Sequence, residues 1–222
     1  MLKIDMAEYY AKRAAVYEDI YSAAERQDDL LTLQVRVQEI LEGHDVLEVG
    51  CGTGFWTEQI AATANSVLAT DVNPEMMKLA QAKNFPADKV QFAIADVFNL
   101  QFDPQPAQPF TAVFLGFLWS HIGRQDQSKL LAHLREKLGA DILLVMIDNS
   151  YVDGSSTVIA RTDEYGNTYQ HRRLPGQPNG DRYEIMKNFP TDSNLRKRLA
   201  PDTRDLRILR LEYYWMLNCK LK

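Results

Sequence analysis

The sequence predicts one α/β domain built around a doubly wound, mostly parallel sheet. Residues 46–49 form a short apolar run typical of a buried parallel strand, and three glycines on alternate positions follow in residues 50–54. A helix continues from about residue 58. Glycine lets the backbone bend sharply and lets a ligand lie directly against main-chain N–H groups. This strand–loop–helix junction is therefore the expected crevice for a nucleotide-like ligand.

The other expected elements alternate between strands and helices. Further buried strands are expected at residues 66–71, 90–97, 110–118 and 141–148, and helices at 6–23, 29–41, 128–138, 192–199 and from about 74. Two strand-like segments, 168–174 and 182–188, flank a loop rich in proline and glycine, which is a strong hairpin signal. A last strand pair is expected at 206–211 and 214–221, and an exposed connector at 103–109.

Composition excludes several classes of protein. The chain has 222 residues, which is long enough for a full core, and a formal net charge of −5, which argues against a nucleic-acid partner. Its two cysteines suggest no disulfide framework and a reducing compartment. No apolar run approaches membrane-spanning length, and the first residues lack the apolar stretch of a signal peptide. We therefore expect a soluble cytoplasmic protein without a membrane partner.

The spacing of the glycine loop indicates its ligand. A dinucleotide fingerprint needs Gly-x-Gly-x-x-Gly, but the sixth place counted from Gly50 is the large aromatic Phe55. The pattern present is Glu-x-Gly-x-Gly-x-Gly, starting at Glu48. A carboxylate there would repel a pyrophosphate, whereas it suits the cationic amino and sulfonium groups of S-adenosylmethionine.

The string at residues 48–54 resembles the first motif of the class I S-adenosylmethionine-dependent methyltransferases. The resemblance runs from Tyr9 to the end of the chain and is specific only in that string. It implies a Rossmann-like sheet of seven strands with the last one antiparallel, an added β-hairpin over the active site, and S-adenosylmethionine as the cofactor. The tyrosine-rich first helix, residues 118–121 and the hairpin are similar to small bacterial O-methyltransferases of small molecules, including those that methylate hydroxyphosphonates.

This resemblance also implies how one domain over residues 1–222 is divided. We expect lid helices in 1–43, a cofactor-binding core in 44–150, a substrate hairpin in 151–190 and a closing helix and hairpin in 191–222.

Two carboxylates end neighbouring strands. Asp71 lies about twenty residues past the glycine loop, where it can accept hydrogen bonds from both ribose hydroxyls, although it could instead cap the helix near Pro74. By resemblance Asp96 takes the adenine amino group and the N–H of Val97 a ring nitrogen; the alternative is a solvated loop carboxylate. The full set of expected cofactor-binding residues is Tyr10, Arg13, Tyr17, Glu48, Gly50, Cys51, Gly52, Gly54, Asp71, Val72, Asp96, Val97 and Gly116.

The helix expected at residues 6–23 carries tyrosines and an arginine at three- and four-residue steps. A face with four tyrosines is unusual for plain core, because each buried hydroxyl needs a partner. The helix either covers the sheet edge or forms a lid in which Tyr10, Arg13 and Tyr17 touch the cofactor carboxylate or the substrate. The resemblance favours the lid.

His121 follows the fourth strand of the expected sheet, where the resemblance places the transferable methyl group. A histidine titrates near neutrality and can remove a proton from an attacking hydroxyl, so His121 is the candidate catalytic base. It could instead be structural, or bind an anionic substrate as imidazolium. Trp119 would line the methyl site or pack against the lid.

The hairpin carries the remaining substrate candidates. With residues 175–180 as its loop, Arg172, Tyr183 and Lys187 share one face. Two cations and a phenol there would suit a carboxylate or phosphonate, unless the face is solvated or forms a dimer contact. The expected substrate-binding residues are Tyr21, Trp119, His121, Arg172, Tyr183 and Lys187, and no metal ligands are expected.

The function predicted from these residues is methyl transfer from S-adenosylmethionine to a small molecule. O-methylation of an anionic or hydroxylated metabolite is expected, by a monomer or homodimer. N-methylation and a catalytically silent S-adenosylmethionine-binding module remain open as alternatives. A nicotinamide-dependent oxidoreductase is disfavoured by Glu48 and Phe55.

Overall fold

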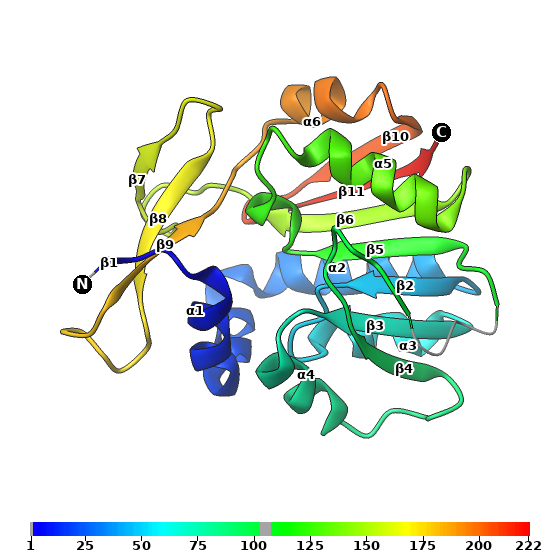
Figure 1. Cartoon of the computed structure of the whole chain (residues 1–222), viewed down its shortest axis with the longest axis horizontal. Coiled ribbons are helices and arrows are strands. Elements are labelled where there is room, and N and C mark those ends of the chain that lie inside the picture. Colours follow the sequence, from blue (N-terminus) through cyan, green and yellow to red (C-terminus); the bar gives the residue numbers. More distant parts are fainter. Residues whose placement is uncertain (1, 103–107) are drawn as a thin grey trace.

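The computed structural model describes residues 2–102 and 108–222, which form two sheets (Figure 1). Most of the predicted connector, residues 103–107, lies outside the described residues. The strands of the large sheet are β2 (Asp45–Val49), β3 (Ser66–Asp71), β4 (Val90–Ile94), β5 (Ala112–Gly116), β6 (Leu143–Asn149), β10 (Thr203–Arg210) and β11 (Tyr214–Leu221). Their order across the sheet is β10-β11-β6-β5-β2-β3-β4.

The five strands from β2 to β6 are parallel, whereas β11 runs antiparallel to both β6 and β10. The predicted doubly wound sheet of seven strands with an antiparallel last strand is therefore confirmed. Since central parallel strands are covered on both faces, their sequences are near-continuous apolar runs, which is why they could be recognised.

Helices cover both faces of this sheet, as the alternation of its side chains requires (Figure 1). Val46 of β2 belongs to the core shared with α2 (Gln27–Leu41), α3 (Phe55–Thr63) and α4 (Pro74–Gln81). The adjacent Leu47 belongs to the core shared with α5 (Gln127–Leu138) and α6 (Asp192–Leu199). Both side chains are fully buried, and burial of such a side chain contributes about 1.5–3 kcal/mol. Within the part of the chain that the structure describes, no helix has both the length and the apolar character needed to cross a membrane.

The helix predicted at residues 6–23 is wrong as one continuous element. It consists of α1 (Met6–Arg13) and the 3₁₀ helix η1 (Ala14–Tyr21), with a backbone break at Val16 (φ −121°, ψ 17°), and the short η2 (Ala24–Arg26) follows. The two parts pack on different surfaces, because Tyr9 contacts the ring of Tyr183 whereas Tyr21 stacks on Phe55. The break lies between these two packing surfaces.

The small sheet contains the predicted hairpin together with further strands. Its strands are β1 (Leu2–Lys3), β7 (Ile159–Thr162), β8 (Thr168–Arg173) and β9 (Arg182–Met186), in the order β1-β9-β8-β7. The predicted register is confirmed, since Arg172 lies opposite Tyr183. Helix α1 contacts both β9 and α4 and lies between the two sheets (Figure 1).

A buried ion pair joins the two sheets. Lys187 directly follows β9, and its Nζ lies 2.8 Å from Oδ1 of Asp148 in β6. Only 4% of Lys187 and none of Asp148 is exposed. The backbone N–H and the hydroxyl of Ser120 also donate to this carboxylate, at 2.8 and 3.0 Å. The pair therefore fixes the small sheet above the turn that follows β5.

Removing one partner of this pair should destabilise the protein strongly. Lys187→Met leaves the buried carboxylate uncompensated, and we expect a loss of about 3–5 kcal/mol in the free energy of unfolding measured with urea. The double variant Asp148→Asn/Lys187→Met removes the uncompensated charge and should recover part of that loss. Lys220→Met, at an exposed position of β11, is the matched control. Equal stability of Lys187→Met and Lys220→Met would contradict the role of the pair.

Candidate active site

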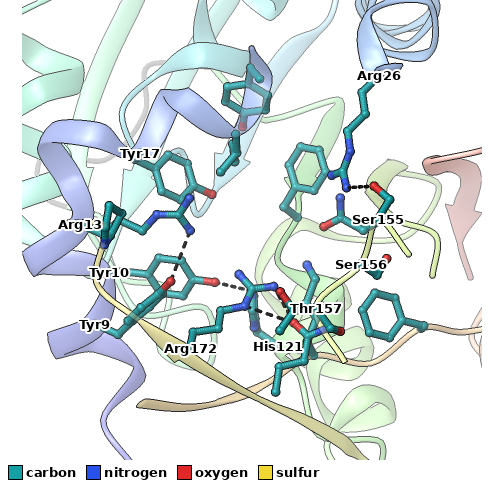
Figure 2. Close-up of a pocket in the computed structure, with 18 of the residues that line it drawn as sticks. Tyr9, Tyr10, Arg13, Tyr17, Arg26, His121, Ser155, Ser156, Thr157 and Arg172 are labelled. Carbon is teal, nitrogen blue, oxygen red and sulfur yellow. Dashed lines mark hydrogen bonds between the residues drawn. The ribbon is translucent and has the colours of Figure 1, made fainter. Parts of the chain in front are cut away.

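Two cavities meet at the carboxyl ends of the parallel strands. The smaller has a volume of about 330 Å³ and the larger about 440 Å³. Tyr10, Tyr17, Phe117 and His121 line both, so these four side chains form a shared wall. Figure 2 shows the larger cavity. In open α/β sheets this edge is where ligands bind.

The glycine loop forms one side of the smaller cavity. Gly50 and Gly52 line it with φ values of +75° and +57°, which only glycine adopts readily. The amides of Gly50 and Cys51 both donate to the carbonyl of Thr70, at 2.8 and 2.9 Å, while the amide of Gly52 donates to Asp71 at 2.8 Å. These bonds fold the loop back over the end of β3.

Asp71 lines the smaller cavity at the end of β3. Its carboxylate accepts from the amides of Gly52 and Asn73, each at 2.8 Å. The N-cap of α4 is Asn73, so the alternative in which Asp71 caps this helix is wrong. Burial raises the pKa of Asp71, and the backbone N–H donors of Asn73 and Gly52 oppose that rise. A carboxylate so held can still accept hydrogen bonds from hydroxyl groups of a ligand.

The other end of the smaller cavity is mostly apolar. Met76, Ala95 and Phe98 line it beside Asp96 and Val97, which is a setting for a flat aromatic ring. The predicted cofactor-binding residues that line this cavity are Tyr10, Tyr17, Gly50, Gly52, Asp71, Val72, Asp96, Val97 and Gly116. Those predicted site residues that line the larger cavity are Tyr10, Arg13, Tyr17, Tyr21, His121, Arg172 and Lys187.

The structure places Glu48 and Gly54 away from the walls of both cavities. Glu48 is 1% exposed beneath the loop, accepts a hydrogen bond of 2.6 Å from Thr57, and has its pKa raised by burial to about 8. Gly54 is the N-cap of α3, and a Cβ there would lie 3.2 Å from Cβ of Ala80 in α4. Both residues support the loop from below, and their contact with the cofactor stays a prediction.

Three further predicted residues also lie away from both walls. Cys51 is buried in the core that α3 covers, and Trp119 in the core that α5 covers. The ring of Tyr183 packs on Tyr9, and its hydroxyl donates to Glu8 of α1 at 3.2 Å. These side chains face neighbouring elements, and their contacts with a ligand stay predictions.

His121 is held in one tautomer. Its Nδ1 lies 2.6 Å from the carbonyl oxygen of Met186, which can only accept, so Nδ1 carries the proton. Nε2 is then the acceptor for the hydroxyl of Tyr10 at 2.9 Å. Burial, with the nearby charge of Lys187, lowers the pKa of His121 to about 3. The imidazole is therefore neutral near pH 7, which argues against the imidazolium as an anion-binding group.

The larger cavity is cationic. Its lining includes Arg13, Arg26, Arg172, Arg173 and Lys187, and no Asp or Glu among the residues described. Lys187 is compensated by Asp148, as described above. Arg172 donates instead to the neutral side-chain oxygen of Gln170 at 2.6 Å, and Arg13 to the hydroxyl of Tyr9 at 3.4 Å (Figure 2). These arginines therefore leave the cavity positively charged.

Sequence reasoning missed Phe117, Asp148 and Arg26. Phe117 has a φ of +58°, uncommon for a residue with a side chain, and lines both cavities. A carboxylate at the carboxyl end of an apolar strand was a usable signal for Asp148. Arg26 lies in a segment without periodicity, and its sequence offered no signal.

Comparison with known proteins identifies part of the chain. The family model described as "Methyltransferase domain" matches residues 46–141. Demethylmenaquinone methyltransferase of Clavibacter sepedonicus is 25% identical over 126 residues, which is 53% of this chain and 50% of that protein. Malonyl-[acyl-carrier protein] O-methyltransferase 1 of Ilyobacter polytropus is 26% identical over 127 residues, 56% of this chain and 44% of that protein. The matches thus span half the length of these relatives or less.

Solved structures agree over most of the chain. The "DhpI-SAH complex structure" has a TM-score of 0.73 at 21% identity and covers 97% of this chain and 94% of that one. The "DhpI-SAM-HEP complex" has a TM-score of 0.72 at 22% identity, with coverages of 96% and 94%. At this identity the likeness shows the fold. The chain therefore has the fold of class I methyltransferases, and its residues 46–141 match a methyltransferase domain. The family match begins in β2 and includes the glycine loop.

The imidazole of His121 should stay neutral, with its proton on Nδ1, down to about pH 5 in the folded protein. The unfolded chain binds a proton at His121 near 6.5, whereas the folded chain does so only near 3. The contribution of His121 to stability is therefore complete above pH 6.5 and is lost as the pH falls, by up to about 1.4 kcal/mol per pH unit. Ring ¹⁵N chemical shifts across a pH titration measure the first effect, and urea unfolding the second.

His121→Asn is the control in both measurements. It assigns the His121 resonances by their disappearance, and it should flatten the loss of stability below pH 6.5. Protonation of His121 near pH 6.5, or an identical pH dependence in the variant, would contradict this account.

Proposed function

We propose that this methyltransferase transfers the methyl group of S-adenosylmethionine to an oxygen of a small anionic metabolite, a carboxylate or a phosphonate. The observation that carries the proposal is a cationic cavity, free of carboxylates among its described lining residues, that shares a wall with the cavity at the glycine loop. An anion held by Arg13 and Arg172 would lie next to that wall.

The residues of the smaller cavity fit the cofactor. Asp71 would accept hydrogen bonds from the ribose hydroxyls, and Asp96 with the N–H of Val97 would pair with the adenine edge. The backbone of Gly50 and Gly52, closed over by the lid residues, suits the amino-acid end. Lid residue Tyr17 and the turn residues Val72 and Gly116 complete the walls. When bound, S-adenosylmethionine supplies a methyl carbon already activated by a sulfonium.

The chain's main task is then to align the acceptor. A lone pair of the acceptor oxygen forms the bond to the methyl carbon while the carbon–sulfur bond breaks, and that electron pair goes to sulfur. A carboxylate or phosphonate oxygen has no proton to lose, so the low pKa of His121 is no obstacle. His121 would act as a positioning residue, since its Nε2 fixes the hydroxyl of Tyr10 at the shared wall.

The charge of the larger cavity also favours O-methylation over the alternative of N-methylation. An amine substrate is protonated near neutral pH and would be repelled by Arg13 and Arg172, which disfavours N-methylation. The name of the Ilyobacter polytropus relative indicates O-methyl transfer in that protein. A silent binding module needs no second cavity beside the cofactor, whereas this chain has one of about 440 Å³.

Asp71→Ala should weaken S-adenosylmethionine binding at least about tenfold, because charge-assisted hydrogen bonds contribute roughly 1.5–3 kcal/mol each. Calorimetric titration measures this affinity. Asp88→Ala, an exposed carboxylate between α4 and β4, is the control. Asp71 also holds the amide of Gly52, so thermal melting without cofactor checks that the variant is folded. Wild-type affinity in a folded Asp71→Ala protein would remove Asp71 from the site.

A panel of small carboxylates, phosphonates, alcohols and amines, assayed for release of S-adenosylhomocysteine, tests the proposal itself. We expect turnover with acids and none with amines. With an accepted acid, Arg172→Ala should raise KM roughly tenfold or more and leave S-adenosylmethionine affinity unchanged, since it removes a charged hydrogen bond to the substrate alone.

Arg182→Ala is the matched control for Arg172→Ala, because Arg182 is exposed on β9 and does not line the larger cavity. Turnover restricted to amines, or equal KM values in these two variants, would overturn the anionic substrate.

A further inference from the structure

We propose that the substrate carries two anionic groups, and that the larger cavity binds the second one at Arg26 and Ser155, at the end away from the methyl site. This inference rests on the proposed function, because it takes the anion beside the shared wall as the methyl acceptor. It adds a requirement for a dianionic substrate, for example a dicarboxylate or a phosphonocarboxylate.

At one end of the larger cavity, Arg172 and Arg13 supply positive charge beside the shared wall. Burial raises the pKa of Tyr10 to about 12, and the charges of Arg172 and Arg13 oppose that rise. Arg172 also contributes to the lowered pKa of His121, after burial and Lys187. Arg172 and Arg13 are therefore close to the Tyr10–His121 hydrogen bond, and an anion bound by them is next to the smaller cavity.

Arg26 provides the positive charge of the other end. It follows η1 in the chain, and its Nη2 donates to the hydroxyl of Ser155 at 2.8 Å. Its Nε is buried without a hydrogen-bond partner, and its guanidinium lies 5.3 Å from the ring centroid of Tyr213. The pKa of Tyr214 is raised by burial, and the charge of Arg26 opposes the rise. The guanidinium of Arg26 is therefore close to Tyr214, the first residue of β11.

The charge of Arg26 is left largely uncompensated. Its ion-pair partner is Glu25. The carboxylate of Glu25 lies 3.9 Å from Nε of Arg26, and the side chain of Glu25 is 52% exposed. An exposed pair at that distance contributes little. Because Arg26 itself is only 22% exposed, an anion in the cavity would be a stronger partner than Glu25.

Hydroxyl groups accompany this second cation. Ser155, Ser156 and Thr157 all line the cavity, and Ser155 is the one bonded to Arg26. Figure 2 shows Arg26 and Ser155 on one side of the cavity, and Arg13 and Tyr10 on the other. The hydroxyl of Ser155 accepts from Arg26 and keeps its own proton to donate to an oxyanion.

The size of the cavity agrees with a ligand that reaches both ends. Its volume of about 440 Å³ falls in the range of roughly 300–1,000 Å³ that holds drug-sized ligands. The aromatic rings of Phe117 and Tyr214, 5.7 Å apart, line the cavity as well. Their faces offer apolar contact for the carbon chain between two anionic groups.

Binding of acids matched in chain length tests this proposal. The probes are pentanoate against glutarate and hexanoate against adipate, titrated by calorimetry into protein saturated with S-adenosylhomocysteine. We expect at least one diacid to bind about tenfold or more tighter than its monoacid. Arg26→Gln should remove that advantage and leave monoacid affinity within about twofold of wild type. Ser155→Ala should reduce the advantage about threefold. Arg36→Gln, in an exposed ion pair on α2, should change nothing.

Other results of these titrations would overturn the second anion site. Equal affinity for both members of each pair in the wild type would overturn the second anion site, as would a diacid advantage that survives Arg26→Gln. Equal weakening of monoacids and diacids by Arg26→Gln would also overturn it, and would make the Arg26–Ser155 bond a purely structural contact. In each of these cases monoacid methylation would leave the proposed function standing. Failure of every acid to bind would overturn both.

Discussion

The buried ion pair between Asp148 and Lys187 is the interaction on which the rest of the site depends. Asp148 ends β6 of the large sheet, Lys187 follows β9 of the small sheet, and their side-chain atoms lie 2.8 Å apart. The same carboxylate accepts from the backbone and hydroxyl of Ser120, which precedes His121. The residue before Lys187 supplies the carbonyl that fixes the His121 tautomer. Asp148 therefore holds the residue before His121, and Lys187 follows the residue whose carbonyl orients His121.

The ion pair also determines which positively charged side chains of the larger cavity are left to bind a ligand. Lys187 lies in the wall of the larger cavity, but its charge is compensated by Asp148, and burial lowers its pKa despite that partner. Arg13 and Arg172 donate to neutral oxygens and keep their full charge. In the proposed function, anion binding would therefore fall to these arginines, whose planar guanidinium matches a carboxylate or phosphonate in two-point contacts.

The large sheet could be predicted from the sequence because its strands are buried on both faces and leave unbroken apolar runs. The small sheet could be predicted only as a hairpin. Strand β1 has two residues and β7 is largely exposed, so their pairing comes from tertiary contacts and leaves no periodic signal. For the site, sequence spacing found Asp71 and Asp96 at strand ends. It did not reveal that the side chain of Glu48 points beneath the loop, because a strand buried on both faces has no polar alternation to indicate direction.

The neutral state of His121 has a consequence for the proposed transfer. The proposed reaction would move a methyl group from a cationic sulfonium to an anionic oxygen and leave two less charged products, so surroundings of low polarity at the point of transfer would favour it. The wall shared by the two cavities consists of Tyr10, Tyr17, Phe117 and His121. An imidazolium there would add a positive charge beside the sulfonium and weaken its binding. By holding the pKa of His121 at about 3, burial keeps the imidazole in that wall uncharged, while Arg13 and Arg172 line the larger cavity.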